Sequence, residues 1–472
     1  MGPGSDVISS SFTANAINTF RHSVDKVTTF MQSGYCVNED EITSLPGLSD
    51  PIKFKQYSGY LNASKGRHHF YWFTESESDP QNAPVVLWLS GGPGCSSICG
   101  AFIENGPFRA NDDGKTLSLN NFAGNKAVNM VYMESPVSTG FSYEENTLKP
   151  HNNDTTAAND NYLALESFFA KYPHLKKNPF YITGESYAEV YIPMLALEIF
   201  KRKSTINLKG ISVGNGLGDD RYYQSQADFF LAHGLVTTDW YDKKISACCE
   251  SQPGIQHECD FNRAPNKTKC ESVPNAKILL RNPYNIYSDC TVDTSVRSVF
   301  DRHYRPHFEM RGIDIVVKCP VNGHTPYLNV ASVQQALHVR DAPVKWGCCD
   351  GLYDRPQDQP PPSQVGHILE LILEYKLGRI VVYNGDLDSL GDVVTGQRFV
   401  DGVAALTDSK KLGTYHEWTE DGRLDGRIGG YAQHYENGLS FVLVRHAGHM
   451  VPGDQPEAAL QVLKELTGIT KL

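Results

Sequence analysis

The stretch Asn178-Pro-Phe-Tyr-Ile-Thr-Gly-Glu-Ser186-Tyr-Ala188 places a serine directly after a short apolar, β-rich run. Gly184 and Ala188 flank Ser186 at two positions on either side, which fits the G-x-S-x-small pattern of a nucleophile elbow. In such an elbow the serine occupies a strained strand-to-helix turn, so its neighbours must be small. The pattern alone is equally typical of an ordinary turn between a strand and a helix. The rest of the chain has to decide between the two.

Apolar runs elsewhere in the chain predict further strands, and the segments between them predict helices. Lys53–Phe73 alternates apolar and polar residues, which predicts two antiparallel strands at a sheet edge. Continuous apolar runs predict buried strands at 84–89, 127–132, 180–183, 209–213, 379–383 and 439–444. Helices are expected after the elbow, at 160–169, from 326 onward and at 456–466. Strands that alternate with helices predict a mostly parallel sheet, in which ligands bind beyond the carboxyl ends of the strands.

A glycine-rich turn, Ser90-Gly-Gly-Pro-Gly-Cys-Ser-Ser97, follows the run at 84–89. In such a turn, backbone N–H groups are free to donate hydrogen bonds to a group that lies beyond the end of the strand. A phosphate-binding loop would need a lysine and then a serine or threonine, and no lysine stands here. An oxyanion site for acyl transfer needs only N–H donors. We therefore expect an oxyanion site at this turn.

Acidic and imidazole side chains follow the last two predicted strands. A serine is a poor nucleophile without a base, and the base needs an acid that orients it. In enzymes built around a nucleophile elbow these groups come in the order serine, acid, histidine. Ser186, Asp388 and His449 come in that order. Asp386 or His446 alone would be better explained as a turn or surface residue, but the three coincident strand ends favour a catalytic triad.

Composition excludes two classes of protein. The chain has 472 residues, 40% of them apolar, and a net charge of −11. Lysine and arginine do not cluster among aromatic residues, so we expect no nucleic-acid partner. No segment has the roughly 18 consecutive apolar residues of a membrane span, so we expect no membrane partner.

The cysteines and three glycosylation sequons point to the secretory route. The chain has 11 cysteines, and Cys248, Cys249, Cys259 and Cys270 crowd into one region. A metal knuckle is disfavoured there, because no histidine stands at zinc-finger spacing and adjacent cysteines fit a tetrahedral site poorly. Disulfides in an oxidising compartment, lysosomal or secreted, are expected instead. The sequons predict glycosylation at Asn62, Asn153 and Asn266.

From about Asp40 to its C-terminus the chain resembles the serine carboxypeptidases, most closely their animal, cathepsin A-like branch. The resemblance implies an α/β-hydrolase fold: a central, mostly parallel sheet flanked by helices, with a disulfide-stapled cap insertion. Four motifs carry it: Leu87-Trp-Leu-Ser-Gly-Gly-Pro-Gly-Cys-Ser-Ser97, Gly184-Glu-Ser-Tyr187, Asn384-Gly-Asp-Leu-Asp388 and Gly448-His-Met-Val-Pro452.

The resemblance also implies roles for single residues. Ser186 would be the nucleophile, His449 the general base and Asp388 the orienting acid, with the N–H groups of Gly92 and Tyr187 as the oxyanion hole. The carboxylate at the substrate's C-terminus would be read by Ser90, Glu104 and Glu185. The implied disulfides are Cys95–Cys349, Cys248–Cys270, Cys249–Cys259 and Cys290–Cys319, while Cys36, Cys99 and Cys348 are left over and a Cys36–Cys99 pair is one option. No cofactor or metal is expected. A homodimer is implied by the resemblance alone.

Three positions depart from the family pattern. Ser90 stands where the family has an asparagine, so one donor replaces the two of an amide. Glu189 stands where a glycine is usual; it would either point to solvent, or clash with a close-packed neighbour, or bring a negative charge near the acyl site. The segment after Asp388, Ser389-Leu-Gly-Asp392, lacks the usual cysteine and asparagine, so side-chain preference does not carry over.

The expected organisation is an expression scar with an N-terminal extension at 1–34, a first core part at 35–217, the cap insertion at 218–335 and a second core part at 336–472. The expected function is hydrolysis of the C-terminal peptide bond of peptides at acidic pH. Two alternatives stay open: an acyltransferase on the same scaffold, and a catalytically impaired homologue that binds or stabilises a partner.

Overall fold

The computed structural model describes residues 39–216, 222–249, 261, 264, 266–273, 282–288, 323–340, 345–355, 362–423 and 425–472. The described residues after Glu41 belong to one compact unit. In that part of the chain, no helix is both long enough and apolar enough to cross a membrane.

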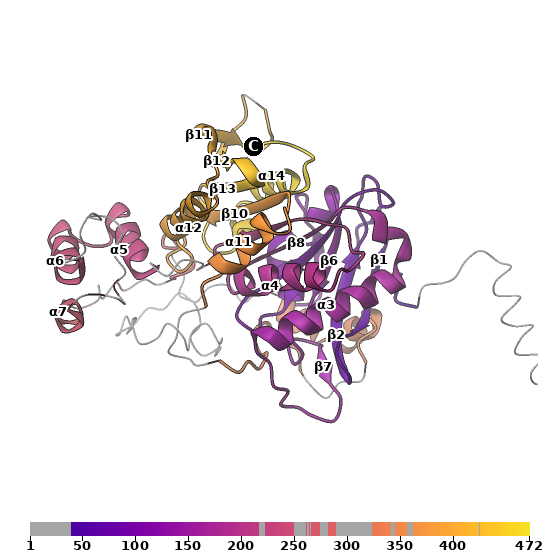
Figure 1. Cartoon of the computed structure of the whole chain (residues 1–472). Helices are drawn as coiled ribbons and strands as arrows, with labels where there is room; N and C mark the ends of the chain where they lie inside the picture. Colours follow the sequence, from indigo (N-terminus) through magenta and orange to yellow (C-terminus); the bar gives the residue numbers. More distant parts are fainter. Residues whose placement is uncertain are drawn as a thin grey trace, which may run out of the picture. The chain divides into compact units, whose positions relative to one another are not determined.

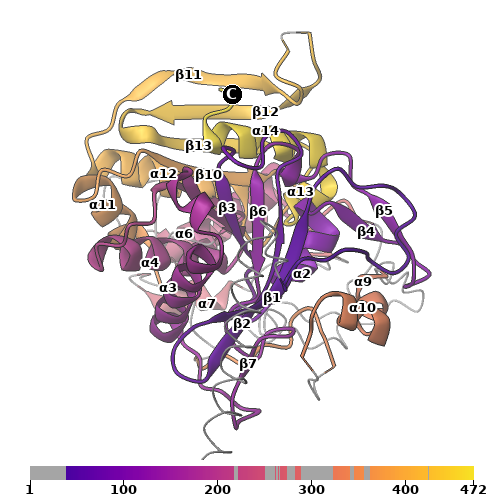
Figure 2. The ribbon, with the colours of Figure 1, turned by 90° about the vertical axis from the view of Figure 1, so that its right-hand side faces the viewer.

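An 11-stranded sheet organises the described residues (Figures 1 and 2). The strand order is β1 (Gln56–Asn62), β2 (Arg67–Thr74), β6 (Asn129–Met133), β3 (Val85–Leu89), β8 (Phe180–Glu185), β9 (Leu208–Gly214), β10 (Arg379–Gly385), β13 (Leu439–Val444), β12 (Ile428–Tyr435) and β11 (Lys411–Thr419), with β7 (Tyr143–Glu144) beside β2. A separate two-stranded sheet joins β4 (Phe108–Ala110) to β5 (Leu117–Leu119).

The strands from β6 to β13 pair in parallel, and the strands at both ends of the sheet pair antiparallel. The carboxyl ends of β3, β8, β9, β10 and β13 therefore meet at one edge. This arrangement confirms the predicted α/β-hydrolase fold, including the antiparallel pair predicted within Lys53–Phe73.

Helices cover the two faces of the sheet, and alternate residues of each strand pack into separate cores. In β3, Val85 and Leu87 belong to one core, whereas Val86 and Trp88 belong to the other. The first core is closed by α3 (Asp154–Lys171), α4 (Ala188–Lys201), α11 (Val365–Leu373) and α12 (Val393–Leu406). The second is closed by α2 (Ser97–Gly100), the short π-helix η1 (Ala101–Asn105) and α14 (Pro456–Thr467). Burial on both faces explains why these strands read as continuous apolar runs.

Several elements were misplaced or missed in the sequence analysis. The helix predicted at 160–169 begins earlier, because Asn153 caps α3 in a capping box with Thr156. Strands β11 and β12 were not predicted, since most of β11 is exposed and shows no alternation of apolar and polar residues. Figure 2 shows them beside β13 at one end of the sheet.

The predicted cap insertion lies mostly outside the described residues, so its boundaries stay a prediction. Its described part contains α5 (Tyr222–Ala232), α6 (Thr238–Cys249), α7 (Lys267–Ser272), α9 (His324–Leu328) and α10 (Ala331–Ala336). The predicted glycosylation sites Asn62, Asn153 and Asn266 are all exposed. Asn153 and Asn266 cap α3 and α7 through their side-chain oxygens, which leaves the amide nitrogen as the attachment atom.

Disulfides join the glycine-rich turn to residues far along the chain. The pairs Cys95–Cys349 and Cys248–Cys270 are confirmed. Cys99 pairs with Cys348, so the Cys36–Cys99 option is wrong. The reason is geometric: α2 presents Cys99 one turn after Cys95, and Cys348 adjoins the partner of Cys95. Cys249 is also disulfide-bonded, whereas Cys36, Cys259, Cys290 and Cys319 lie outside the described residues.

A side chain at Gly184 is sterically excluded. A Cβ there would lie 2.0 Å from the backbone oxygen of Leu89 on the neighbouring β3 and 2.9 Å from Cβ of Ala188. We expect Gly184→Ala to destabilise the protein by about 3 kcal/mol or to prevent folding, because the shorter contact is with the backbone of the neighbouring strand, which cannot move aside. Gly366→Ala in α11 is the matched control, since no atom of the described residues lies within 4 Å of its added Cβ. Thermal unfolding would measure both, and equal melting temperatures for the two variants would contradict this steric reading.

Candidate active site

Ser186 occupies the turn between β8 and α4 in the left-handed backbone region, with φ of +59°. A serine rarely adopts this conformation, so the turn is strained as an elbow requires. The Ser186 N–H donates to the backbone oxygen of Gly214 at 2.8 Å, which fixes the turn against β9. The Ser186 hydroxyl is buried and has no hydrogen-bond partner among the described residues. The elbow thus places the Ser186 hydroxyl at the end of β8 without a hydrogen bond to another described residue.

Asp388 and His449 form a buried pair beyond β10 and β13. His449 Nδ1 lies 2.6 Å from Asp388 Oδ2. The Asp388 carboxylate also accepts from the N–H groups of Leu390 at 2.8 Å and Gly391 at 2.9 Å. Because Nδ1–H is held by the carboxylate, Nε2 is left as the basic nitrogen of the imidazole.

Asn215 also binds the Asp388 carboxylate. It was not identified as a site residue in the sequence analysis. It follows β9, and its side-chain amide donates to Asp388 Oδ2 at 2.9 Å. The only available signal was its place: Asn215-Gly216 directly follows a predicted strand, as do the other polar groups. Ser186, Asn215, Asp388 and His449 therefore stand at the carboxyl ends of four neighbouring strands, β8, β9, β10 and β13.

A segment of the predicted insertion, residues 282–288, contacts both loops of the pair. The Pro283 backbone oxygen accepts from Ser389 N at 3.1 Å and from Ser389 Oγ at 2.7 Å. The Tyr284 backbone oxygen accepts from His449 N at 2.7 Å, and the two rings meet edge to face at 5.2 Å. This part of the insertion thus stabilises the loops that carry Asp388 and His449 through hydrogen bonds and a ring contact.

The glycine-rich turn packs directly on the elbow. A Cβ at Gly91 would lie 2.4 Å from Tyr187 N and 2.7 Å from Ser186 Cβ, so only glycine permits this approach. Gly92 follows with φ of +109°, a conformation that favours glycine. Tyr187 stands at the start of α4, where backbone N–H groups have no partner within the helix. The two predicted oxyanion donors therefore belong to backbone segments in contact.

Two buried carboxyls, Glu104 of η1 and Glu185 at the end of β8, share a hydrogen bond. Burial raises the pKa of Glu104 to about 7, although the bond from Glu185 lowers it. Burial and the neighbouring charge of Glu104 raise the pKa of Glu185 well above its usual range. At least one of the two is therefore protonated at neutral pH and can donate to an anion.

Ser90 lies beside this pair. The position that a Cβ of Gly100 would take is 2.9 Å from Ser90 Oγ and 3.1 Å from Glu104 Oε1, so both atoms face the same spot. Trp88 Nε1 donates to Ser90 Oγ at 3.1 Å. Since that bond uses the oxygen as acceptor, the Ser90 O–H remains able to donate. The structure brings the three predicted carboxylate-reading residues together.

Glu189 is buried in the first turn of α4, which rules out the alternative that it points to solvent. A Cβ at Gly216 would lie 2.8 Å from its Oε2, which places the carboxyl beneath the end of β9. The Glu189 side chain therefore lies against Gly216, in the segment that follows β9 and carries Asn215.

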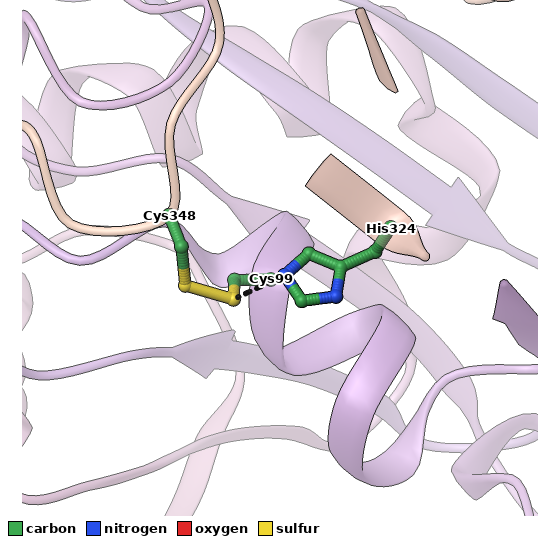
Figure 3. Close-up of side chains that lie close together, drawn as sticks. All are labelled: Cys99, His324 and Cys348. Carbon is green, nitrogen blue, oxygen red and sulfur yellow. Dashed lines mark hydrogen bonds between the residues drawn. A yellow bond between two sulfur atoms is a disulfide. The ribbon is translucent and has the colours of Figure 1, made fainter. Parts of the chain in front are cut away.

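Cys99, His324 and Cys348 also gather in one place (Figure 3). His324 Nε2 lies 3.5 Å from Cys99 Sγ. These residue types could ligate a metal, but the two sulfurs are bonded to each other and offer no thiolate. We therefore interpret the cluster as a structural disulfide, Cys99–Cys348, with His324 packed beside it.

Comparison with known proteins gives consistent matches over most of the chain. The sequence model of the serine carboxypeptidase family, Peptidase_S10, matches residues 46–468. The lysosomal protective protein of Mus musculus is 36% identical over 453 residues, covering 89% of this chain and 92% of that protein. Serine carboxypeptidase ctsa-4.1 of Caenorhabditis elegans is 33% identical over 443 residues, covering 90% and 92%.

Among solved structures, the chain is similar to Kex1(delta)p, a prohormone-processing carboxypeptidase from Saccharomyces cerevisiae. The TM-score is 0.68 at 21% identity, and the match covers 91% of this chain and 96% of that one. At this identity the similarity supports the fold.

The buried carboxyls predict how stability depends on pH. The folded state raises the pKa of Glu104 from 4.5 to about 7. Stability from this group is therefore fully present below about pH 4.5 and is lost as pH rises through about 7. At about 1.4 kcal/mol per pKa unit, the loss is on the order of 3 kcal/mol. We expect urea unfolding to show lower stability at pH 8 than at pH 5, and Glu104→Gln to reduce the difference. The same pH dependence in both proteins would contradict the assignment.

Proposed function

Because the chain belongs to the serine carboxypeptidase family, we propose that it removes the C-terminal residue of peptides and proteins through an acyl-enzyme on Ser186. The observation that carries the proposal is the Asp388–His449 pair, held at 2.6 Å beyond strands that neighbour the Ser186 elbow. Ser186 attacks the last peptide carbonyl, and His449 Nε2 accepts the serine proton. Asp388 keeps the imidazole in the required tautomer and stabilises its charged form.

The tetrahedral intermediate carries a negative oxygen, which the N–H groups of Gly92 and Tyr187 would receive. His449 then protonates the amine of the departing amino acid, and the acyl group stays on Ser186. A water molecule attacks this ester with His449 again as base, which releases the shortened peptide. No step calls for a metal or cofactor.

Selection of the chain end is assigned to Ser90, Glu104 and Glu185. A free C-terminal carboxylate would accept hydrogen bonds from the Ser90 hydroxyl and from the protonated carboxyl of the glutamate pair. Internal peptide bonds have no such carboxylate, so they gain nothing from this site. An acidic compartment, lysosomal or on the secretory route, suits a site that works protonated. The exposed sequons and the disulfides support the same location.

The pH dependence of binding tests this assignment. As pH rises through about 7, Glu104 loses its proton. The negative charge of Glu104 then repels the substrate's own carboxylate. We expect the KM of a blocked dipeptide to rise about tenfold between pH 5.5 and pH 8, with kcat less affected. Glu104→Gln should flatten the KM profile. A dipeptide amide, which lacks the terminal carboxylate, serves as control and should show no such rise. A KM for the free acid that is independent of pH would overturn the assignment.

The two alternatives are tested with the same substrate. Ser186→Ala should lower kcat/KM for a Cbz-Phe-Leu substrate by about 10³-fold or more, because no acyl-enzyme can form, and should abolish labelling by a fluorophosphonate. Adding an alcohol separates hydrolysis from acyl transfer, since a transferase would give mainly the ester. If the parent is inactive and unlabelled while Glu189→Gly recovers activity, the chain is a silenced homologue and the binding-partner alternative replaces the proposal.

A further inference from the structure

Another buried carboxyl lies behind the glycine-rich turn and has no part in the steps above. Glu134 directly follows β6 and is fully buried. Its Oε1 accepts from Ser96 Oγ and, at 2.9 Å, from Trp346 Nε1. Its Oε2 accepts from Phe141 N at 2.6 Å. One side chain thus binds three segments that are far apart in the sequence.

The space for this carboxyl is built into the backbone. Gly140 has φ of +54°, and a Cβ there would lie 1.9 Å from Glu134 Oε1. Any side chain at Gly140 would therefore displace the carboxyl from its donors. The close fit shows that the loop around Phe141 is shaped to receive Glu134 in one position.

Ser96 transmits this contact to the glycine-rich turn. Its Oγ accepts from Ile98 N at 3.1 Å and from Cys99 N at 3.3 Å, so it caps α2 while it donates to Glu134. The turn itself closes through Cys95 N, which donates to the backbone oxygen of Gly91 at 3.0 Å. Ser96 therefore fixes the end of the turn whose beginning carries Gly92.

The segment around Trp346 meets the same turn from behind. The Cys348 backbone oxygen accepts from Ser96 N at 2.7 Å, and Gly351 N donates to the Gly94 backbone oxygen at 3.1 Å. The disulfides Cys95–Cys349 and Cys99–Cys348 join the same two segments covalently. Glu134 Oε1 is the acceptor on which both segments converge.

We propose that Glu134 is a positioning residue for the oxyanion hole: through Ser96 it holds the glycine-rich turn so that the Gly92 N–H stays aimed at the reacting carbonyl oxygen. The inference rests on the proposed function. Glu134 touches no reacting atom in this scheme. Its effect should appear in the stabilisation of the oxyanion and not in the binding of the substrate's C-terminus.

The chemistry of the site explains why a carboxyl is required. Both oxygens face N–H donors, so both must accept. An ionised carboxyl satisfies this, with Ser96 Oγ donating to Oε1. Burial raises the pKa of Glu134 to about 7, although the hydrogen bonds from Ser96, Trp346 and Phe141 lower it. A glutamine cannot satisfy the site, since its NH₂ would face either Trp346 Nε1–H or Phe141 N–H.

The test compares Glu134→Gln and Ser96→Ala with the parent. We expect kcat for a blocked dipeptide to fall by about 10- to 100-fold in each, because small displacements of aligned groups carry losses of this size. KM should change less than about threefold, since Glu104 and Glu185 bind the C-terminus elsewhere. The inhibition constant of a peptide aldehyde, whose hemiacetal with Ser186 places a negative oxygen in the hole, should rise in proportion to the loss in kcat/KM. The inhibition constant of the blocked amino-acid product should not change.

A matched control is Glu465→Gln, which changes another buried glutamate that lies on α14 beside Arg379. It should leave kcat and the aldehyde constant unchanged. In the double variant of Glu134→Gln and Ser96→Ala, the two losses should not add, because both break the same contact.

The outcomes separate this inference from the proposed function. If the parent hydrolyses the dipeptide and the folded variants keep its kcat and aldehyde affinity, Glu134 serves stability alone and the inference is wrong. Should Glu134→Gln fail to fold, Ser96→Ala carries the same comparison. If the parent neither hydrolyses the substrate nor binds the aldehyde, the proposed function fails and this inference fails with it.

Discussion

The active site depends on the close approach of two backbones, the glycine-rich turn after β3 and the elbow after β8. Side-chain-free positions make the approach possible: a Cβ at Gly91 or at Gly184 would enter the space of the opposite backbone. Because β3 and β8 are parallel neighbours, their carboxyl ends are brought together by the sheet itself. The strained conformation of Ser186 is then maintained by contacts that the surrounding sheet enforces.

Burial of acidic groups is the second organising feature. Glu104, Glu134 and Glu185 are buried, and burial raises the pKa of each. Two of them face the site assigned to the substrate's carboxylate, and the third holds the turn behind the oxyanion hole. Carboxyls that keep a proton below about pH 7 can donate hydrogen bonds to anions, which ionised carboxylates cannot do. The folded state and the proposed activity therefore favour the same acidic conditions.

The departures from the family pattern have different consequences in the structure. Ser90 lies beside Glu104 and retains one hydrogen-bond donor, so the proposed carboxylate site has one donor where the family's asparagine offers two. Glu189 is buried beneath the end of β9, close to the strand that supports Asn215. This carboxyl thus adjoins the segment whose Asn215 donates to Asp388.

The sequence by itself determined the strand pattern, the elbow and the order of Ser186, Asp388 and His449, because periodicity and local turn chemistry are properties of short stretches. The family resemblance added the roles of single residues, which short-range patterns do not encode. Only the tertiary structure decided the place of Asn215, the Cys99–Cys348 pair and the burial of Glu134 and Glu189. Each of these depends on contacts between segments that are distant in the sequence. The strand order and the packing of helices against the sheet determine those contacts, and short-range sequence patterns do not encode them.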